Sequence, residues 1–193
     1  MAQITVGHLG RGTYTEEATD IFIQRRVKQR RGESYQKRPL ASISGVFLHL
    51  EQKMIDAAVV PLMNSIAGIY IETFKGLMRY DFVQRGSLDL PIRLMFGINR
   101  LARSDELNEV RSKDTALREC AHYLDKHFSH LRRVGVENTG EAIESISRDG
   151  LMHVGAVGSR YGMNMYGLKI IGENIEDDSS NNTTFLMLAR KKG

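Results

Sequence analysis

The sequence has a single cysteine, Cys120, and no apolar run long enough to cross a bilayer. One cysteine excludes an internal disulfide framework and is compatible with a reducing compartment. Residues 1–12 also lack the charged start and apolar centre of a secretory signal. We therefore expect a cytoplasmic protein with no membrane partner.

The sequence also has few residue patterns typical of metal sites or of nucleic-acid binding. His122, His127 and His130 lack the i, i+4 spacing of paired ligands on a helix, so no metal site is predicted. No aromatic residues interleave with the one basic cluster to stack on bases, so no nucleic-acid partner is predicted. The cluster is typical of a helix's C-terminal end, where cations favour the helix dipole and Gly32 ends the helix. It consists of Arg25, Arg26, Lys28, Arg30 and Arg31.

The chain's 193 residues are enough for one domain or for two small lobes with a buried core. Apolar segments typical of strands alternate with segments typical of helices, and no connection demands a hairpin. We therefore predict an α/β fold with mostly parallel sheets. Strands are expected over 4–6, 57–61, 91–101, 134–136, 154–157, 168–171 and 185–189, helices over 44–53, 105–110, 112–128 and 142–148 and from residue 159, and a loop over 32–39.

A turn punctuated by Gly7, Gly10 and Gly12 follows the first strand. Thr13 comes next, and Glu16 lies three residues further on, which is the spacing of a capping box at a helix start. Glycines let backbone N–H groups approach a ligand closely, so this turn suits an anion. It does not suit a nicotinamide cofactor, because the basic helix end stands where an acidic residue is expected about 20 residues later.

Polar residues follow other strands too. Asn64 and Ser65 come after the apolar segment 57–61, and we interpret them as a second strand-to-helix transition. Ligands in open α/β sheets bind beyond the carboxyl ends of the strands, so these residues are expected to share a crevice with the glycine turn. A simple N-cap role for Asn64 and Ser65 is the alternative. Asn138-Thr139-Gly140-Glu141 forms a further capping box, which opens the helix predicted over 142–148.

The segment from Tyr166 to Phe185 holds the candidate chemical centre. It leads Thr183 to the start of the last strand, where backbone groups can fix the rotamer of the hydroxyl. A hydroxyl held in this way can donate a proton to a leaving group. The alternative is that residues 181–184 form a turn and satisfy their own backbone.

Taken in order, these segments resemble the catalytic domain of prephenate dehydratases over nearly the whole chain, 1–193. The matching pieces are Gly7-His8-Leu9-Gly10-Arg11-Gly12-Thr13-Tyr14-Thr15-Glu16-Glu17-Ala18, Ala58-Val59-Val60-Pro61 with Asn64-Ser65 and Gly68, Thr139 with Glu141-Ala142, and, most specifically, Tyr166-Gly167-Leu168, Glu173-Asn174-Ile175-Glu176-Asp177, Asn181, Thr183 and Phe185.

The resemblance implies two lobes like those of type 2 periplasmic binding proteins, with a ligand cleft between them. Lobe 1 would cover about 1–81 and 176–193, and lobe 2 about 82–175. It also implies a homodimer that removes carbon dioxide and water from prephenate, a small dicarboxylate, without a cofactor. Thr183 would be the general acid, and helix N-termini at Thr13, Ser65 and Thr139 would hold the carboxylates. The implied substrate-binding residues are Arg11, Thr13, Thr15, Asn64, Ser65, Thr139 and Phe185.

The chain also departs from the family pattern. Thr184 replaces the arginine of the family's Thr-Arg-Phe, and Met63 replaces the glutamate of its Glu-Asn-Ser. Gly10-Arg11 stands in place of Gly-Pro, and residues 112–115 stand in place of Ser-His-Pro-Gln. Because the chain ends at Gly193, we expect no phenylalanine-sensing ACT domain. We hypothesise that Arg11 supplies the positive charge that the lost arginine would give to a dicarboxylate site.

Three functions are compatible with these residues. The first is dehydratase-type elimination from prephenate or a close cyclohexadienol acid such as arogenate, and the retained Thr183 favours it. The second is the non-aromatising prephenate decarboxylase of specialised metabolism, favoured by the changes at Met63 and Thr184. The third is a catalytically inactive carboxylate-binding paralogue, because a fold alone does not secure a reaction. We predict the first, an aromatising lyase.

Overall fold

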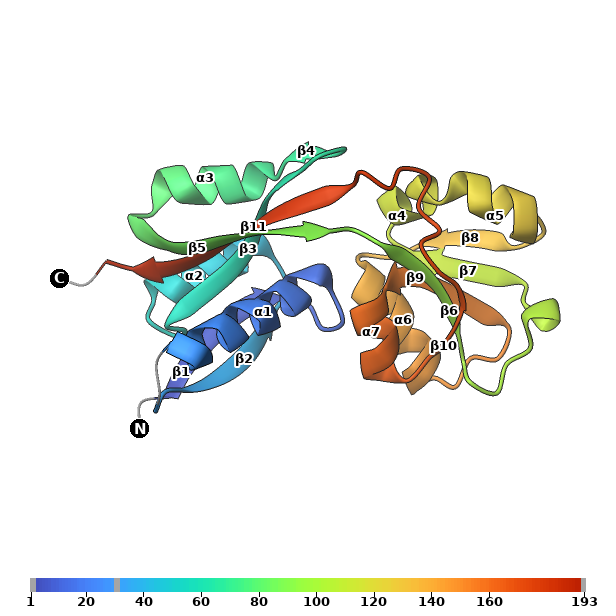
Figure 1. The fold of residues 1–193 in the computed structure, drawn as a ribbon, viewed down its shortest axis with the longest axis horizontal. Helices are drawn as coiled ribbons and strands as arrows, with labels where there is room; N and C mark the ends of the chain where they lie inside the picture. The colour runs from blue at the N-terminus through green and yellow to red at the C-terminus, as the bar shows by residue number, and fades with distance from the viewer. Residues whose placement is uncertain (1–2, 30–31, 192–193) are drawn as a thin grey trace. The chain divides into compact units, whose positions relative to one another are not determined.

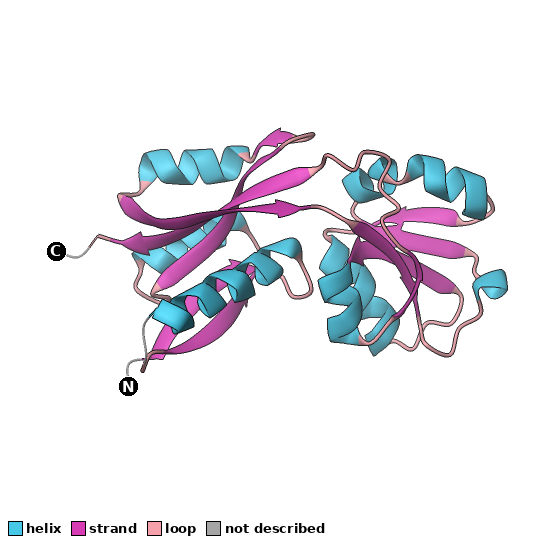
Figure 2. Cartoon of the chain, viewed as in Figure 1, coloured by secondary structure: helices cyan, strands magenta, loops and turns pink. Residues whose placement is uncertain are grey.

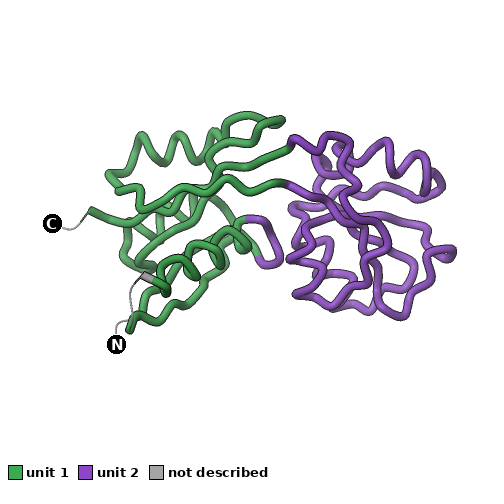
Figure 3. The backbone as a smooth tube through the Cα atoms, in the orientation of Figure 1, with its two compact units in different colours: residues 1–10, 15–91, 181–193 green, residues 11–14, 92–180 purple. Residues whose placement is uncertain are grey.

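The computed structural model describes residues 3–29 and 32–191, so Arg30 and Arg31 of the basic cluster lie outside the described residues. Contacts divide the chain into two units (Figure 3). Unit 1 comprises 1–10, 15–91 and 181–193, and unit 2 comprises 11–14 and 92–180. The main segment of unit 2 is therefore 92–180, whereas the sequence predicts a lobe over about 82–175. The short loop 11–14 belongs to unit 2, although the segments on either side of it belong to unit 1.

The strands of unit 1 are β1 (Gln3–Leu9), β2 (Ser34–Leu40), β3 (Ala57–Asn64), β4 (Gly68–Ile69), β5 (Phe82–Pro91) and β11 (Asn182–Arg190). They form a mixed sheet in the order β2-β1-β3-β11-β5, with β4 paired to the end of β3 (Figure 1). β1 is parallel to both β2 and β3, whereas β11 is antiparallel to β3 and to β5. The last strand of the chain thus lies between β3 and β5, inside the first unit's sheet.

Helices α1 (Tyr14–Gln29), α2 (Ile43–Glu51) and α3 (Ile71–Arg79) cover the two faces of this sheet. α2 and α3 pack on the face that carries Val60 and Leu186. Phe22 of α1 lies on the other face, where a Cβ added to Gly86 would be 3.1 Å from its ring. Successive strand residues point to opposite faces, so Met187, the register partner of Gly86, faces α1. Each face of the sheet therefore has its own apolar layer.

The strands of unit 2 are β6 (Leu94–Ile98), β7 (Glu109–Ser112), β8 (Arg132–Gly135), β9 (Val154–Ser159) and β10 (Lys169–Gly172). They form a second mixed sheet in the order β10-β6-β9-β7-β8. β7 is parallel to β8 and β9, whereas β6 is antiparallel to β9 and to β10. The helical elements are η1 (Ser104–Glu106), α4 (Asp114–Glu119), α5 (Ala121–Phe128), α6 (Thr139–Arg148) and α7 (Arg160–Tyr166).

Neighbouring residues of β6 divide the interior of unit 2 into two layers. Phe96 packs with Leu117 and Leu124 of α4 and α5, while Met95 packs with Ile143 of α6 and Met163 of α7. Helices therefore flank the sheet on both faces, an arrangement that Figure 2 shows for both units. Within residues 3–29 and 32–191, no helix is both long enough and apolar enough to span a membrane.

The α/β class is confirmed, but the prediction of mostly parallel sheets is wrong, because both sheets are mixed. The predicted loop over 32–39 is also wrong, since Ser34–Leu40 is strand β2. β2 lies at the edge of the sheet and is largely polar, with no fully buried residue. An edge strand of this kind is recognisable only from its backbone pairing with β1, because it lacks the apolar run of a central strand.

Two helix predictions in unit 2 are corrected as well. The segment 105–110 is not one helix, because η1 ends at Glu106 and Val110 is a buried residue of β7. The helix predicted over 112–128 is interrupted at Cys120, whose φ of −118° and ψ of 17° are not helical. The carbonyl of Glu119 accepts a hydrogen bond from Asp177 N at 2.6 Å. The Glu119 carbonyl at the end of α4 thus bonds to the backbone of Asp177, outside the helix, at the point where α4 and α5 are separated.

Candidate active site

Asn64, the last residue of β3, organises a tight turn with its side chain. Its Oδ1 accepts hydrogen bonds from Ile66 N at 3.0 Å and from Ala67 N at 2.7 Å. The chain then reverses at Gly68, whose φ is +83°, into β4, which is antiparallel to β3. The prediction that Asn64 and Ser65 open a helix is therefore wrong. The polar residues after the strand satisfy a hairpin turn, and α3 begins only at Ile71.

The amide nitrogen of Asn64 contacts the start of β11. Asn64 Nδ2 lies 2.9 Å from Thr183 Oγ1, 2.6 Å from Asn181 Oδ1 and 3.2 Å from the carbonyl oxygen of Asn182. Asn64 and Thr183 are register partners in the sheet. Ser65 joins the same region, because Asn182 N donates to Ser65 Oγ at 3.0 Å. We call the side chains of Asn64, Asn181 and Thr183 the Thr183 cluster.

The Thr183 cluster is buried, with exposed fractions of 6% for Asn64, 1% for Asn181 and 2% for Thr183. Because the Oδ1 atom of Asn64 is occupied by two backbone donors, its NH2 group faces Thr183 and donates to the hydroxyl oxygen. Within residues 3–29 and 32–191, the Thr183 hydroxyl proton has no acceptor. The Thr183 hydroxyl thus accepts a hydrogen bond from Asn64, and a hydroxyl that accepts in this way still has a proton of its own to donate.

Thr184 lies on the opposite face of β11, because successive strand residues alternate. Its hydroxyl donates to Asp89 Oδ1 at 2.6 Å, and its register partners are Met63 on β3 and Asp89 on β5. The next residue, Phe185, is 2% exposed and belongs to the interior of unit 1. The position at which the family has an arginine is therefore on the face away from the Thr183 hydroxyl.

The glycine loop packs against two helix starts of unit 2. Ser159 Oγ donates to the carbonyl oxygen of Gly12 at 3.2 Å. A Cβ added to Gly140 would lie 2.0 Å from the carbonyl oxygen of Arg11, and one added to Gly162 would lie 2.5 Å from that of Gly12. Only glycine permits so close an approach of two backbones. The first turns of α6 and α7 therefore fix the path of the loop.

Both helix starts are capped by side chains. Asn138 accepts from Glu141 N at 2.9 Å at the start of α6, and Ser159 accepts from Gly162 N at 3.0 Å at the start of α7. The helix start predicted near Thr139 is confirmed, with Asn138 as its N-cap and Thr139 as its first residue. Thr13 is 9% exposed and its methyl group would lie 3.1 Å from a Cβ on Gly140. Arg11, Thr13 and Thr139 are thus brought together in unit 2, and Arg11 is exposed.

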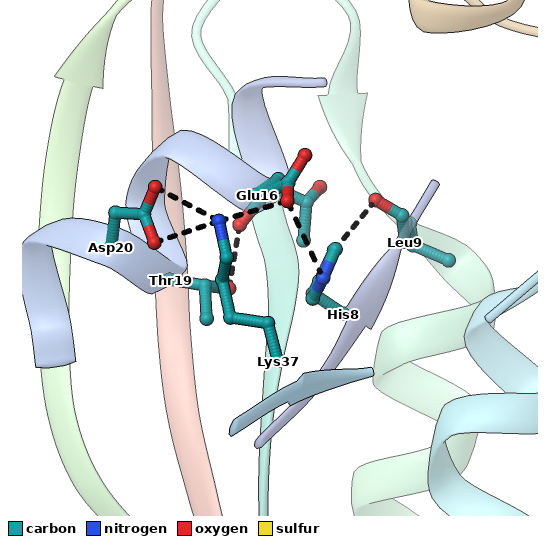
Figure 4. A network of polar contacts seen from close by, with 7 residues as sticks. His8, Leu9, Glu16, Thr19, Asp20 and Lys37 are labelled. Atoms are coloured by element: carbon teal, nitrogen blue, oxygen red, sulfur yellow. Dashed lines mark hydrogen bonds and ion pairs between the residues drawn. The ribbon is translucent and has the colours of Figure 1, made fainter. Parts of the chain in front are cut away.

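A buried polar network lies beneath the start of α1 in unit 1 (Figure 4). Glu16 is 4% exposed and forms an ion pair with Lys37 at 2.8 Å, and Lys37 also pairs with Asp20 at 2.9 Å. His8 is fully buried, and its Nε2 lies 4.0 Å from Glu16 Oε1. Burial lowers the pKa of His8, an effect opposed by the backbone carbonyl of Leu9 and by the charge of Glu16.

Sequence reasoning did not find this network, because Lys37 stands in the segment predicted as a loop. Pairing of β2 with β1 carries Lys37 to the first turn of α1. Thr15 belongs to the same region and is 5% exposed, with its carbonyl oxygen accepting from Thr19 Oγ1 at 2.8 Å. Thr15 is therefore part of the buried start of α1, and its role in binding stays a prediction.

The fold and the Thr183 cluster define an α/β protein of two units, with a buried threonine hydroxyl that accepts a hydrogen bond from an asparagine amide. The chain belongs to the prephenate dehydratase family, a family of lyases, because that family's model matches residues 6–193. It is 31% identical over 193 residues to the bifunctional chorismate mutase/prephenate dehydratase of Aquifex aeolicus, covering 98% of this chain and 49% of that protein. It is 33% identical over 153 residues to arogenate dehydratase 2 of Petunia hybrida, covering 79% of this chain and 38% of that protein. The chain thus spans about half the length of these relatives or less.

Solved structures share the fold. A prephenate dehydratase from Arthrobacter aurescens, in complex with L-Phe, superposes with a TM-score of 0.82 at 19% identity, covering 98% of this chain and 61% of that one. A periplasmic substrate-binding protein of an ABC transporter from Coxiella burnetii gives a TM-score of 0.53 at 12% identity, covering 97% and 85%. The predicted likeness to periplasmic binding proteins is confirmed at the level of the fold.

Proposed function

We propose that the chain catalyses a decarboxylating elimination from prephenate or a close relative such as arogenate, with Thr183 as the general acid. In this reaction the bond to the ring carboxylate breaks and releases carbon dioxide. Its electron pair enters the ring, and the ring hydroxyl leaves as water after it receives a proton. Aromatisation supplies the driving force, so the protein needs mainly to hold the substrate and to deliver that proton.

The observation that carries the proposal is the direction of the hydrogen bond between Asn64 and Thr183. Because the Thr183 oxygen accepts from Asn64 Nδ2, its own proton points to another group. A leaving hydroxyl is such a group. The Thr183 cluster is buried, and buried donors exert a stronger effect than they do in water.

Binding of the carboxylates is proposed for the glycine loop and the start of α6. The first backbone N–H groups of a helix, together with its dipole, favour an anion. Thr13 and Thr139 offer hydroxyl groups there, and the exposed Arg11 offers a positive charge. Arg11 can hold a carboxylate with two hydrogen bonds, which a lysine at the same place would not reproduce.

Product analysis tests the reaction. The protein is incubated with prephenate, and separately with arogenate, at neutral pH beside a protein-free control, because prephenate aromatises unaided in acid. We expect phenylpyruvate from prephenate, detected by its strong absorbance in alkali. Release of carbon dioxide with a product that keeps the ring hydroxyl would instead indicate the non-aromatising decarboxylase. Absence of turnover with saturable thermal stabilisation would indicate the inactive carboxylate-binding paralogue.

The non-aromatising decarboxylase is the second candidate because of Met63 and Thr184. These two residues depart from the family pattern, although the residues next to them match it. Both lie on the face away from Thr183, as register partners of each other. The departures therefore leave the Thr183 cluster in place, which supports the aromatising reaction over the alternative.

We also propose that the chain forms a homodimer. Ile71, Phe74 and Met78 recur at helical spacing on α3, and they are 58%, 51% and 76% exposed. An exposed apolar stripe of this kind favours burial against another surface. Glu72 lies in the first turn of the same helix and Arg79 is its last residue, so an antiparallel pair of α3 helices places opposite charges beside each other.

A further inference from the structure

Asn181 stands immediately before β11 and is the most deeply buried residue of the Thr183 cluster, with 1% of its surface exposed. Its Oδ1 lies 2.6 Å from Asn64 Nδ2, the shortest contact that this amide nitrogen makes. Asn181 is not itself a hydrogen-bond partner of the Thr183 hydroxyl; the two residues share Asn64. Asn181 can therefore act on the Thr183 hydroxyl through Asn64, the residue that both contact.

The carboxamide of Asn64 has two possible orientations that differ in which atom faces Thr183. In the observed one, the NH2 group supplies two hydrogens to the acceptors at Asn181 and Thr183, with the carbonyl of Asn182 close by at 3.2 Å. In the reversed one, Oδ1 would face the acceptor oxygen of Asn181, which is repulsive, and would accept the proton of Thr183. The reversed orientation would therefore consume the proton that the reaction needs.

We infer that Asn181 is a positioning residue that holds the Asn64 carboxamide with its NH2 group toward Thr183 and so keeps the Thr183 proton free for transfer. The backbone donors Ile66 N and Ala67 N act in the same sense from the other end of the amide. Asn181 adds the constraint from the strand that carries Thr183. The inference rests on the proposed role of Thr183 as the acid.

The test is a double-mutant cycle with Asn181→Leu and Thr183→Val, using prephenate turnover by the whole chain. Leucine keeps the branching of the asparagine side chain but is larger and accepts no hydrogen bond. We expect Asn181→Leu to lower kcat about tenfold or more, the effect of one lost buried hydrogen bond, with KM changed less than about twofold. In the Thr183→Val background, the same substitution should change kcat less than about twofold, because the hydroxyl through which it acts is gone.

Controls separate positioning from folding. Thermal unfolding of each variant measures its folded fraction, and Ser179→Leu introduces the same side chain at an exposed position two residues earlier in the sequence. If Asn181→Leu does not fold, Asn181→Ala takes its place in the cycle. An equal loss of kcat from Asn181→Leu in both backgrounds overturns the positioning role and leaves the proposed function standing. Absence of turnover by the unaltered chain overturns the proposed function, and the inference with it.

Discussion

Two adjacent threonines, Thr183 and Thr184, have hydroxyl groups in different environments. The Thr183 hydroxyl accepts from an amide and is 2% exposed, whereas the Thr184 hydroxyl donates to the exposed carboxylate of Asp89. A donor that already has an acceptor loses that bond when it protonates another group. The difference supports the proposal that Thr183, and not Thr184, is the acid, and it makes Thr184 a matched control one residue away.

We predict that Thr183→Val lowers kcat by about 10² to 10⁴, the usual contribution of a positioned acid, while KM changes little. Valine keeps the branched shape of threonine and removes only the hydroxyl. Steady-state kinetics with prephenate measure both parameters. Thr184→Val should retain most of the activity, because its hydroxyl lies on the other face of the strand. Equal losses from the two substitutions would show that Thr183 is not the specific proton donor.

His8 gives a second prediction at this scale, concerning pH. Burial lowers its pKa in the folded chain, while in the unfolded chain the pKa is about 6.5. The unfolded state therefore binds a proton first as pH falls. The corresponding stability is present above about pH 6.5 and is lost as pH falls from there toward the folded-state pKa.

Urea unfolding at a series of pH values between about 7 and 5 checks this linkage. We expect the free energy of unfolding to fall more steeply with acidification in the unaltered chain than in the His8→Gln variant. His130→Gln, at an exposed position, serves as the control and should follow the unaltered chain. Parallel slopes for the unaltered chain and His8→Gln would mean that another group causes the acid sensitivity.

At the scale of secondary-structure elements, the pairing of β3 with β11 brings together two of the departures from the family pattern. Met63 and Thr184 are cross-strand partners, and Asp89 is the partner of Thr184 on the other side. A glutamate and an arginine at these two positions would therefore face each other. Their joint replacement removes one charge of each sign and so leaves the net charge of this part of the sheet unchanged.

We predict that Met63→Glu and Thr184→Arg are coupled in stability and nearly silent in catalysis. In a double-mutant cycle followed by urea unfolding, the pair should show a favourable coupling of about 0.2–1 kcal/mol, the range for opposed charges across strands. The kcat of the double variant should stay within about twofold of the unaltered chain, because the pair lies away from Thr183. A large loss of kcat without loss of stability would place this face in contact with the substrate.

The same elements show which parts of the structure the sequence could predict. Apolar runs such as 57–61 identified central strands, and the spacing of Asn138 and Glu141 identified a helix start. The polar strand β2 was missed because its pairing with β1 leaves little apolar pattern. Asn64 suits a helix cap and a hairpin turn equally well, since both use a side-chain oxygen to accept backbone N–H groups. Asn64 and Asn181 are 117 positions apart in the sequence, and a local sequence pattern cannot predict a contact between residues so far apart.

At the scale of the whole molecule, exposed apolar side chains are concentrated in one part of the sequence. Of the large apolar residues that are exposed, six lie between Met63 and Met78, and those on α3 form a single stripe. Charged side chains at both ends of α3 flank that stripe. Association of two copies through this surface would bury it.

We predict that Phe74→Lys shifts the chain from dimer to monomer in sedimentation velocity at micromolar concentration. A lysine at the centre of the stripe would have to bury its charge in the interface. Leu101→Lys is the control, because Leu101 is 82% exposed but belongs to unit 2 and not to the α3 stripe. A dimer that survives Phe74→Lys would show that a different surface holds the copies together.

The loop 11–14 has a consequence for how the chain can be divided genetically. Its residues pass from unit 1 into unit 2 and back, so the polypeptide changes unit at 10/11, 14/15, 91/92 and 180/181. A gene fragment encoding 92–180 would lack the carbonyl oxygens of Arg11 and Gly12, on which Ser159 and the tight glycine contacts of two helices depend. The segment 92–180 alone is therefore an incomplete unit 2. A chimera that exchanges unit 2 between relatives has to include the loop 11–14 as well as the segment 92–180.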